Sequence, residues 1–400
     1  MKAVILAAGE GSRMRPLTYT RPKVMLPIAN KPIVEHLLIE ATAAGIKEFI
    51  FIVGYRDEQV RNYFGDGAQW GVSIEYCMQR KQLGTADALK MAEGLVDGNF
   101  LMMNGDVIVK HEDISRLMHK KETTISIMEV ADTRGLGIIE LAKNRVVQIY
   151  EKTAQPPFNT ANAGLYLFTP AIFEAIAQTP KSPRGEYEIT TSLQLLMDAG
   201  HTILPHRINY WLDLTYPWNL LTANESLLKD VPAQNQGTVE PNAVIKDKVA
   251  IGPDSIIRSG SYIVGPVIIG RDCEIGPNCY IRPGTAIGDN CHLGSAVEVK
   301  NSIIMRGTKI PHQNYVGDSI IGEDCNLGAG TKIANLRLDN KNVTAGGIDT
   351  GRRKLGAIIG DRVEIGINSS INVGAMIGNN THIGPGATAS GIILPDSRIL

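Results

Sequence analysis

Two patterns of apolar residues divide this chain of 400 residues. Up to about residue 230, short apolar runs alternate with segments in which apolar residues recur at helical spacing. This alternation predicts an open α/β sheet that binds its ligands at the carboxyl ends of its strands. The expected strands are 2–6, 48–53, 73–76 and 100–103, and the expected helices are 33–44, 58–64 and 85–93.

Beyond residue 240, an apolar residue recurs at every sixth position. The repeating positions are Ile245, Ile251, Ile257, Ile263, Ile269, Ile275, Ile281, Ile287, Leu293, Val299, Ile321, Leu327, Ile333, Ile359, Ile365, Ile371, Ile377 and Ile383. Six residues per side and three sides per turn predict a left-handed parallel β-helix. The frame slips near Pro311, and the segment from Leu338 to Leu355 interrupts the ladder. A loop of this length in a prism is usually functional. We therefore expect it to reach over the active site of a neighbouring prism. Its arginines are either part of that site or simply solvated.

The predicted fold class is therefore α/β, with an N-terminal Rossmann-like domain followed by a C-terminal left-handed parallel β-helix of hexapeptide repeats. The expected boundaries are residues 1–230 for the first domain, 231–240 for a linker and 241–400 for the β-helix.

Composition excludes several classes of protein. The net charge of −1 argues against a nucleic-acid binder, and no apolar run approaches the roughly 18 residues of a membrane span. Met1 and Lys2 lead directly into a strand without a signal peptide, so we expect a cytoplasmic protein. Four of the five cysteines share one phase of the six-residue repeat with small residues, which favours a packing role over a metal cluster or disulfides.

The stretch from Leu6 to Pro16 is a candidate phosphate site. Gly9 and Gly11 let backbone N–H groups approach an anion, and Arg13 adds positive charge. Met14 stands where the dinucleotide fingerprint needs its third glycine, and no Gly-Lys-Ser/Thr of a P-loop follows. The alternative is a glycine turn with solvated arginines.

Two carboxylates are candidate metal ligands. Asp106 follows a buried strand and Gly105, and Asp213 follows the apolar pair Trp211-Leu212. Two carboxylates together with substrate phosphates are a common ligand set for Mg²⁺. Taken alone, Asp106 is also compatible with an ordinary turn.

Seven motifs of the first domain occur in the order and spacing of one enzyme family. They are Leu6–Pro16, Arg21–Lys23, Gly84–Ala86, Asn104–Asp106, Glu151–Lys152, Asn162–Gly164 and Trp211–Asp213. With these motifs the domain resembles the sugar-1-phosphate nucleotidylyltransferases. The resemblance implies that a sugar-1-phosphate oxygen attacks the α-phosphorus of a nucleoside triphosphate and that pyrophosphate leaves.

The same resemblance implies roles for individual residues. Arg13 would hold the departing pyrophosphate, Lys23 the phosphates at the reacting centre, and Asp106 and Asp213 the metal. The nucleotide would contact Ala8, Gly9, Gly11, Gln79, Gly84 and Thr85. The sugar would contact Gly137, Glu151, Lys152, Asn162 and Gly164. Leu136 stands where several thymidylyl enzymes have tyrosine, which leaves the sugar open.

The β-helix carries a second set of motifs, namely Arg282–Gly284, Glu298–Lys300, Pro311–Asp318 and Asn326–Thr331. They are similar to the acetyltransferase half of bacterial bifunctional N-acetylglucosamine-1-phosphate uridylyltransferases. The whole chain resembles the archaeal bifunctional sugar-1-phosphate nucleotidylyltransferase/acetyltransferases even more closely. The substrate-binding residues implied are Arg282, Lys300, Tyr315, Asn326, Asn335 and Lys354, with Ala329 beside the arm of acetyl-CoA.

An amino sugar must lose a proton before its nitrogen attacks acetyl-CoA, and histidine, with an unperturbed pKa of about 6.5, suits that task near neutral pH. His312 is the candidate base. These resemblances imply a homotrimer that uses UTP or dTTP, a hexosamine-1-phosphate, acetyl-CoA and Mg²⁺ in UDP-N-acetylglucosamine synthesis.

Two alternatives stay open. One is a glucose-1-phosphate thymidylyltransferase or GDP-mannose-type pyrophosphorylase whose prism is only structural or regulatory. The other is a sugar-nucleotide sensor without catalysis.

Overall fold

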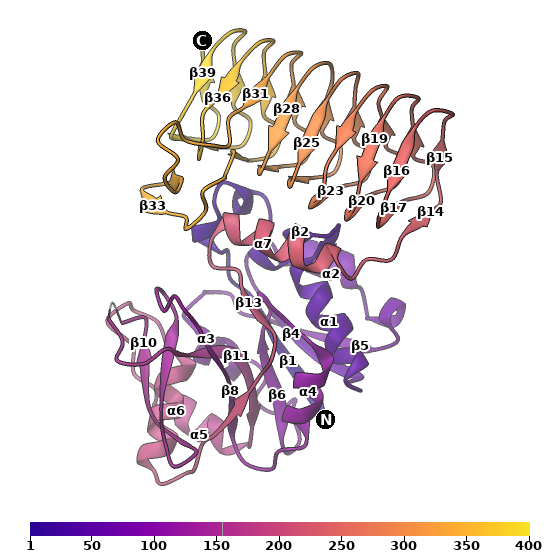
Figure 1. Ribbon diagram of the computed structural model, residues 1–400. Coiled ribbons are helices and arrows are strands. Elements are labelled where there is room, and N and C mark those ends of the chain that lie inside the picture. Colours follow the sequence, from indigo (N-terminus) through magenta and orange to yellow (C-terminus); the bar gives the residue numbers. More distant parts are fainter. Residues whose placement is uncertain (154) are drawn as a thin grey trace. The chain divides into compact units, whose positions relative to one another are not determined.

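The computed structural model describes every residue except Ala154 and forms two compact units (Figure 1). The first unit comprises Met1–Glu10, Arg21–Met25 and Pro32–Asp213, and the second comprises Gly11–Thr20, Leu26–Lys31 and Leu214–Leu400.

A mixed sheet of nine strands forms the centre of the first unit. Its parallel part consists of β5 Ser73–Met78, β4 Glu48–Val53, β1 Lys2–Ala7 and β6 Phe100–Asn104, in that spatial order. The remaining strands are β11 Thr160–Phe168, β9 Gly137–Ala142, β10 Arg145–Glu151, β8 Thr124–Glu129 and β12 Leu204–Arg207. Strand β11 is antiparallel to β6, β8 and β9, while β12 pairs parallel with β8, so this part of the sheet is mixed.

Helices cover both faces of this sheet. Successive side chains of a strand point to opposite faces, so Ala3 and Ile5 join one buried cluster while Val4 joins the other. The first cluster packs under α1 Ile33–Ala43, α2 Asp57–Phe64 and α4 His111–Met118. The second packs under α3 Thr85–Lys90, α5 Ala171–Gln178 and α6 Ile189–Asp198. Burial on both faces explains why the central strands are almost continuously apolar. The predicted α/β class is confirmed.

The second unit contains α7 Pro217–Leu228 and a three-faced prism of short parallel strands (Figure 1). Face 1 consists of β14 Gln234–Asn235, β17 Val249–Ile251, β20 Val267–Ile269, β23 Thr285–Ile287, β26 Ile303–Ile304, β29 Ile320–Ile321, β34 Ile358–Ile359, β37 Met376–Ile377 and β40 Ile392–Ile393. Face 2 consists of β15 Thr238–Val239, β18 Ile256–Ile257, β21 Glu274–Ile275, β24 His292–Leu293, β27 Lys309–Ile310, β30 Asn326–Leu327, β35 Glu364–Ile365, β38 His382–Ile383 and β41 Arg398–Ile399. Face 3 consists of β16 Val244–Lys246, β19 Tyr262–Val264, β22 Tyr280–Ile281, β25 Glu298–Lys300, β28 Tyr315–Gly317, β31 Lys332–Ile333, β36 Ser370–Ile371 and β39 Thr388–Ala389.

The six-residue repeat forms the core of this prism, as the sequence predicts. On face 2, for example, Ile257 stacks on Ile275 and Ile275 on Leu293 in the parallel register. The columns from the three faces merge into one buried apolar cluster. The predicted left-handed parallel β-helix is confirmed.

The frame of the ladder changes at places other than Pro311, which was the expected position. The inward residues Val299 and Ile304 are one position closer than the repeat requires, and so are Val316 and Ile321. Both shortened steps fall at the corner between face 3 and face 1. Between them the repeat continues through Ile310, which the sequence pattern missed. The interruption at 338–355 falls at the same corner and contains the hairpin of β32 Thr344–Ala345 and β33 Ile348–Asp349.

The cysteines of the prism behave as small buried residues. Cys273, Cys279, Cys291 and Cys325 are buried as free thiols, and each thiol donates to a backbone carbonyl group.

Within the described part of the chain, none of the helices has the length and apolarity needed to cross a membrane.

Truncating an inward residue of the prism should destabilise it strongly. We expect Ile281→Ala to lower the free energy of unfolding by about 2–5 kcal/mol, because Ile281 is 0% exposed and a cavity would remain. Ile392→Ala is the matched control, since Ile392 lies on the same prism and is 63% exposed. Denaturant unfolding of both variants measures the difference; equal losses would contradict an inward column at Ile281.

Candidate active sites

The carboxyl ends of β1 and β6 bring two motifs of the first unit together. These strands are parallel neighbours, with Leu6 opposite Asn104. The Gly105 N–H donates to the Leu6 carbonyl at 2.9 Å, and a Cβ on Gly105 would lie 2.7 Å from that oxygen. Only glycine allows this close approach, which places Asp106 beside the loop that follows β1.

Both candidate metal carboxylates lie at this edge. Strand β7 Val107–Val109 pairs antiparallel with β13 Trp211–Asp213, and Asp213 is opposite Val107. Opposite residues in such a ladder have Cα atoms about 4.5–5.5 Å apart, so Asp213 lies next to the strand that begins after Asp106. The pairing therefore brings the backbone of Asp213 close to that of Asp106, although the two residues are distant in sequence.

Lys23 lies against the first of these carboxylates. Its Nζ is 2.5 Å from Asp106 Oδ2, and its backbone N–H donates to the Glu10 carbonyl at 3.2 Å. The lysine side chain is 13% exposed and the aspartate side chain is 35% exposed, so the pair faces a partly open space. A cation and a carboxylate held in this way can both interact with phosphate groups and a metal.

Gly11 and Arg13 belong to the second unit. Gly11 has a φ of 78°, a left-handed conformation that favours glycine. Arg13 is exposed and lines a pocket of about 240 Å³ within that unit. The other residues around this pocket are Ser12, Arg15, Pro16, Tyr19, Tyr216, Trp218, Ala345, Gly346, Ile348, Met376, Ile392, Ile393 and Leu394.

Three predicted nucleotide-binding residues form a tight cluster. Buried Gln79 donates through Nε2 to the Gly84 carbonyl at 3.1 Å and to Asp87 Oδ2 at 2.8 Å. The Thr85 hydroxyl accepts the N–H of Ile189 at 2.9 Å. Ala8, at the end of β1, accepts the N–H of Tyr55 through its carbonyl at 3.0 Å.

The predicted sugar-binding residues also lie together. Gly137 is opposite Glu151, and a Cβ on Gly137 would meet Glu151 Oε2 at 3.0 Å and Asn162 Nδ2 at 3.8 Å. Strand β11 changes register between Asn162 and Tyr166, with Gly164 at a φ of 74° inside this bulge. Bulges of this kind redirect side chains near binding sites.

The structure adds Arg184 and Asn104, which had no assigned role, and it places Lys152 beside the same carboxylate as Arg184. Lys152 Nζ is 3.5 Å and Arg184 Nη2 is 3.6 Å from Glu151 Oε1. Arg184 also pairs with Glu188 at 2.7 Å. The segment Arg184–Thr190 also matches the family in sequence, which could have indicated a role for Arg184. The charges of this segment are equally compatible with the start of a helix. Asn104 contributes too, since a Cβ on Gly164 would lie 2.6 Å from its Nδ2.

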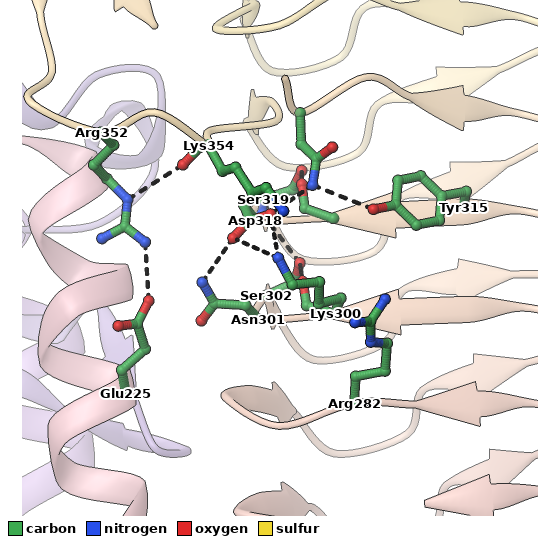
Figure 2. A network of polar contacts seen from close by, with 12 residues as sticks. Glu225, Arg282, Lys300, Asn301, Ser302, Tyr315, Asp318, Ser319, Arg352 and Lys354 are labelled. Carbon is green, nitrogen blue, oxygen red and sulfur yellow. Dashed lines mark hydrogen bonds and ion pairs between the residues drawn. The ribbon is translucent and has the colours of Figure 1, made fainter. Parts of the chain in front are cut away.

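On the prism, the corner between face 3 and face 1 gathers polar side chains from successive turns (Figure 2). Arg282 pairs with Glu298 at 2.9 Å, which raises the pKa of the guanidinium. Lys300 Nζ lies 3.1 Å from Asp318 Oδ2. Asn335 Nδ2 donates to the Tyr315 hydroxyl at 3.2 Å. Burial raises the pKa of the Tyr315 phenol, so it remains a neutral donor at physiological pH.

The 338–355 loop is attached at this corner. Lys354 pairs with Leu336 in an isolated antiparallel β-bridge. Arg352 reaches α7, where it donates to Thr222 at 2.8 Å and to Glu225 at 2.9 Å. Figure 2 shows the contact with Glu225. Arg352 is therefore anchored by an ion pair, and the solvated alternative is wrong for this arginine.

His312 lies at a different corner, between face 2 and face 3. It is exposed in the turn after β27, and its carbonyl accepts the N–H of Gly330 at 3.0 Å, next to Ala329. Asn326 is exposed on the adjacent strand β30 of face 2. The predicted acetyltransferase residues thus occupy both edges of face 3.

Comparisons with known proteins identify relatives of both parts of the chain. Residues 2–230 match the nucleotidyl transferase family, and residues 263–372 match the GMPPB C-terminal domain family. The Bifunctional protein GlmU of Methanococcus maripaludis is 40% identical over 390 residues, covering 96% of this chain and 93% of that protein. The bifunctional sugar-1-phosphate nucleotidylyltransferase/acetyltransferase of Sulfurisphaera tokodaii is 40% identical and covers 98% of this chain and 97% of its own length.

The chain belongs to this bifunctional family. Its members combine nucleotidyl transfer with acetyl transfer, so the chain is a transferase of both kinds. A Bacillus anthracis crystal structure assigned to the glucose-1-phosphate thymidylyltransferases is a partial match. It is 28% identical with a TM-score of 0.53 and covers 59% of this chain and 98% of its own.

The turn at Gly84 should be sensitive to a single methyl group. Gly84 has a φ of 117°, and a Cβ there would lie 2.3 Å from the Tyr187 carbonyl oxygen. We expect Gly84→Ala to lower kcat/KM for the nucleoside triphosphate about 10²-fold, because displacement by an ångström misaligns bound groups.

Gly45→Ala is the matched control for this variant. Gly45 has a φ of 104° but nothing within 4 Å of the added methyl group. Steady-state kinetics of both variants, with acetyl transfer measured in parallel, test the expectation. Equal losses in the two variants would mean that backbone strain alone is responsible.

Proposed function

We propose that this transferase acetylates the amine of glucosamine-1-phosphate, or of a similar hexosamine-1-phosphate, with acetyl-CoA. Its other reaction transfers a nucleotidyl group from UTP or dTTP to the sugar-1-phosphate and releases pyrophosphate. The observation that carries the proposal is the polar cluster of Arg282, Lys300, Asp318 and Asn335 on the prism. A prism that only supports the first unit has no need of such a cluster.

In the nucleotidyl reaction, an oxygen of the sugar-1-phosphate bonds to the α-phosphorus and the bond to pyrophosphate breaks. Lys23 and Arg13 would bind phosphate groups, while Gln79 and Gly84 would contact the base. Glu151, Asn162 and Gly164 would orient the sugar. Positioning and charge stabilisation account for most catalysis of this kind.

Asp106 and Asp213 would hold Mg²⁺, which when bound neutralises charge on the phosphates. In the part of the chain that the structure describes, no cluster of three or more His, Cys, Asp or Glu residues is suited to a metal. A pair of carboxylates fits Mg²⁺, because this ion retains waters and substrate phosphates as its other ligands.

In the acetyl reaction, the amine nitrogen bonds to the acetyl carbon and the carbon–sulfur bond of acetyl-CoA breaks. His312 would take the proton from the amine and return it to the departing thiolate. Arg282, Lys300 and Lys354 would bind the sugar phosphate, with Tyr315, Asn326 and Asn335 contacting the sugar. Ala329 would leave space for the arm of acetyl-CoA.

We further propose a homotrimer assembled through the prism, since His312 and Lys300 lie at opposite edges of face 3 and a groove between copies would unite such edges. The free buried thiols agree with a cytoplasmic location.

A substrate matrix tests the proposal. UTP, dTTP and GTP are combined with several sugar-1-phosphates, with and without acetyl-CoA, and both CoA and pyrophosphate are measured. We expect CoA release only with amino-sugar phosphates, and pyrophosphate release with UTP or dTTP.

A second candidate is a pyrophosphorylase whose prism is structural, and the match of residues 263–372 to the GMPPB C-terminal domain favours it. Pyrophosphate release without any CoA release would support this candidate.

A further inference from the structure

Asp318 is the most deeply buried charge at the proposed acetyltransferase site. Its side chain is 3% exposed. Oδ2 lies 3.1 Å from Lys300 Nζ and accepts Asn335 Nδ2 at 2.5 Å, while Oδ1 accepts Asn301 Nδ2 at 2.8 Å. One carboxylate therefore joins side chains of the turns before and after its own. Figure 2 shows its contacts with Lys300 and Asn301.

The backbone of Asp318 is fixed as well. Its N–H donates to the Lys300 carbonyl at 2.9 Å, and its carbonyl accepts the N–H of Gly356 at 2.8 Å. Gly356 follows Lys354 closely, so the same residue also holds the end of the 338–355 loop. Asp318 has a φ of 50°, a left-handed conformation that aspartate and asparagine tolerate better than most residues.

The fold of the corner does not require this buried charge. The four earlier corners between face 3 and face 1 are turned at exposed Asp247, Gly265-Pro266, Pro283-Gly284 and uncharged Asn301, so none of them buries a charge. Burying an ion pair costs desolvation energy and is weak evidence for a stabilising role. A carboxylate at this position is better explained by what it holds, namely a lysine and an amide that face the corner.

We propose that Asp318 is a positioning residue for acetyl transfer, orienting Lys300 and Asn335 toward the amino-sugar phosphate; this rests on the proposed function of the corner. The carboxylate balances the charge of Lys300 before the substrate phosphate arrives. It also fixes the orientation of the Asn335 amide, because a carboxylate accepts hydrogen bonds and therefore faces the NH₂ group. Asp318 itself is too deeply buried to reach the substrate.

Asp318→Asn tests this role, because it preserves the shape and the left-handed backbone. Its amide would present NH₂ to Asn335 or to Lys300, both of which are donors. We expect kcat/KM for the amino-sugar phosphate in acetyl transfer to fall about 10²-fold. The KM for acetyl-CoA and the rate of nucleotidyl transfer to N-acetylglucosamine-1-phosphate should stay near their original values.

Asp324→Asn is the matched control, since Asp324 is exposed on the same prism and has a φ of 54°. It should leave both reactions unchanged. The double variant Lys300→Met/Asp318→Asn removes both charges and so avoids an unpaired buried lysine. Its acetyl-transfer rate should match that of Lys300→Met alone, because residues that act as one unit have non-additive effects.

The outcomes separate the possible failures. An active wild type with an equally active Asp318→Asn variant would overturn the positioning role, as would additive losses in the double variant. Parallel losses in both reactions together with a lower Tm would assign Asp318 to stability alone and also overturn the role. A wild type that releases no CoA with any amino-sugar phosphate would overturn the proposed function and this inference with it.

Discussion

Replacing His312 by alanine is expected to lower kcat for acetyl transfer about 10²–10⁴-fold, the range that a general base usually contributes. The amine must lose a proton as it attacks the acetyl carbon, and His312 is the residue proposed to accept it. The imidazole lies in an exposed turn, so its removal should not disturb the inward column at Ile310. Release of CoA, followed by thiol detection, measures the effect.

The matched control is His382→Ala, because His382 is an exposed histidine on face 2, where it lies 3.0 Å from Glu364. This variant should acetylate normally. Nucleotidyl transfer should be unchanged in both variants, since it depends on residues of the first motif set. An acetyl-transfer rate within about threefold of wild type in His312→Ala would exclude the histidine as the base.

The fold was predictable from sequence where local patterns determine it. Inward positions such as Ile257 and Ile275 stack in the order in which they occur along the chain, so a fixed spacing is enough to predict the column. The shortened steps were harder to locate. Val299 and Ile304 differ from the regular repeat by one residue, and several alignments of the repeat accommodate such a slip until the strand register is known.

The roles of charged residues depend on distant partners and were less predictable. Asp318 has the same residue type and left-handed backbone as Asp254, Asp272 and Asp324, which turn other corners of the prism. What distinguishes Asp318 is its contact with Lys300 and Asn335, and no local pattern contains that information. Likewise, Arg352 finds its partner Glu225 in α7, 127 residues away.

For the nucleotidyl site, the sequence predicted the residue types and the structure supplied the strand pairing that links the segments carrying them. Asp106 and Asp213 were paired by chemistry and family resemblance alone. The antiparallel register of β7 and β13 now places Asp213 opposite Val107. Lys23 adds a cation at 2.5 Å from Asp106, a contact that the motif order did not reveal.

Asp106→Asn should abolish nucleotidyl transfer, lowering kcat at least about 10³-fold, a loss typical of removing a charge that stabilises phosphoryl chemistry. The substitution keeps the size of the side chain but removes half of the carboxylate pair proposed for Mg²⁺. It also leaves Lys23 without its anionic partner. Pyrophosphate release under saturating UTP and sugar-1-phosphate measures the loss, and CoA release should remain at the wild-type rate.

Asp57→Asn provides the control, since Asp57 also lies in an ion pair of the first unit, 2.6 Å from Arg61 on a helix. Surface changes of this kind usually alter stability by less than about 0.5 kcal/mol, and both reactions should persist. A titration with Mg²⁺ separates the two roles of Asp106. If the carboxylate binds the ion, residual activity in Asp106→Asn should require higher Mg²⁺ concentrations, and Asp213→Asn should behave alike. An unchanged Mg²⁺ dependence in both variants would mean that neither carboxylate binds the ion, which would then depend on the substrate phosphates.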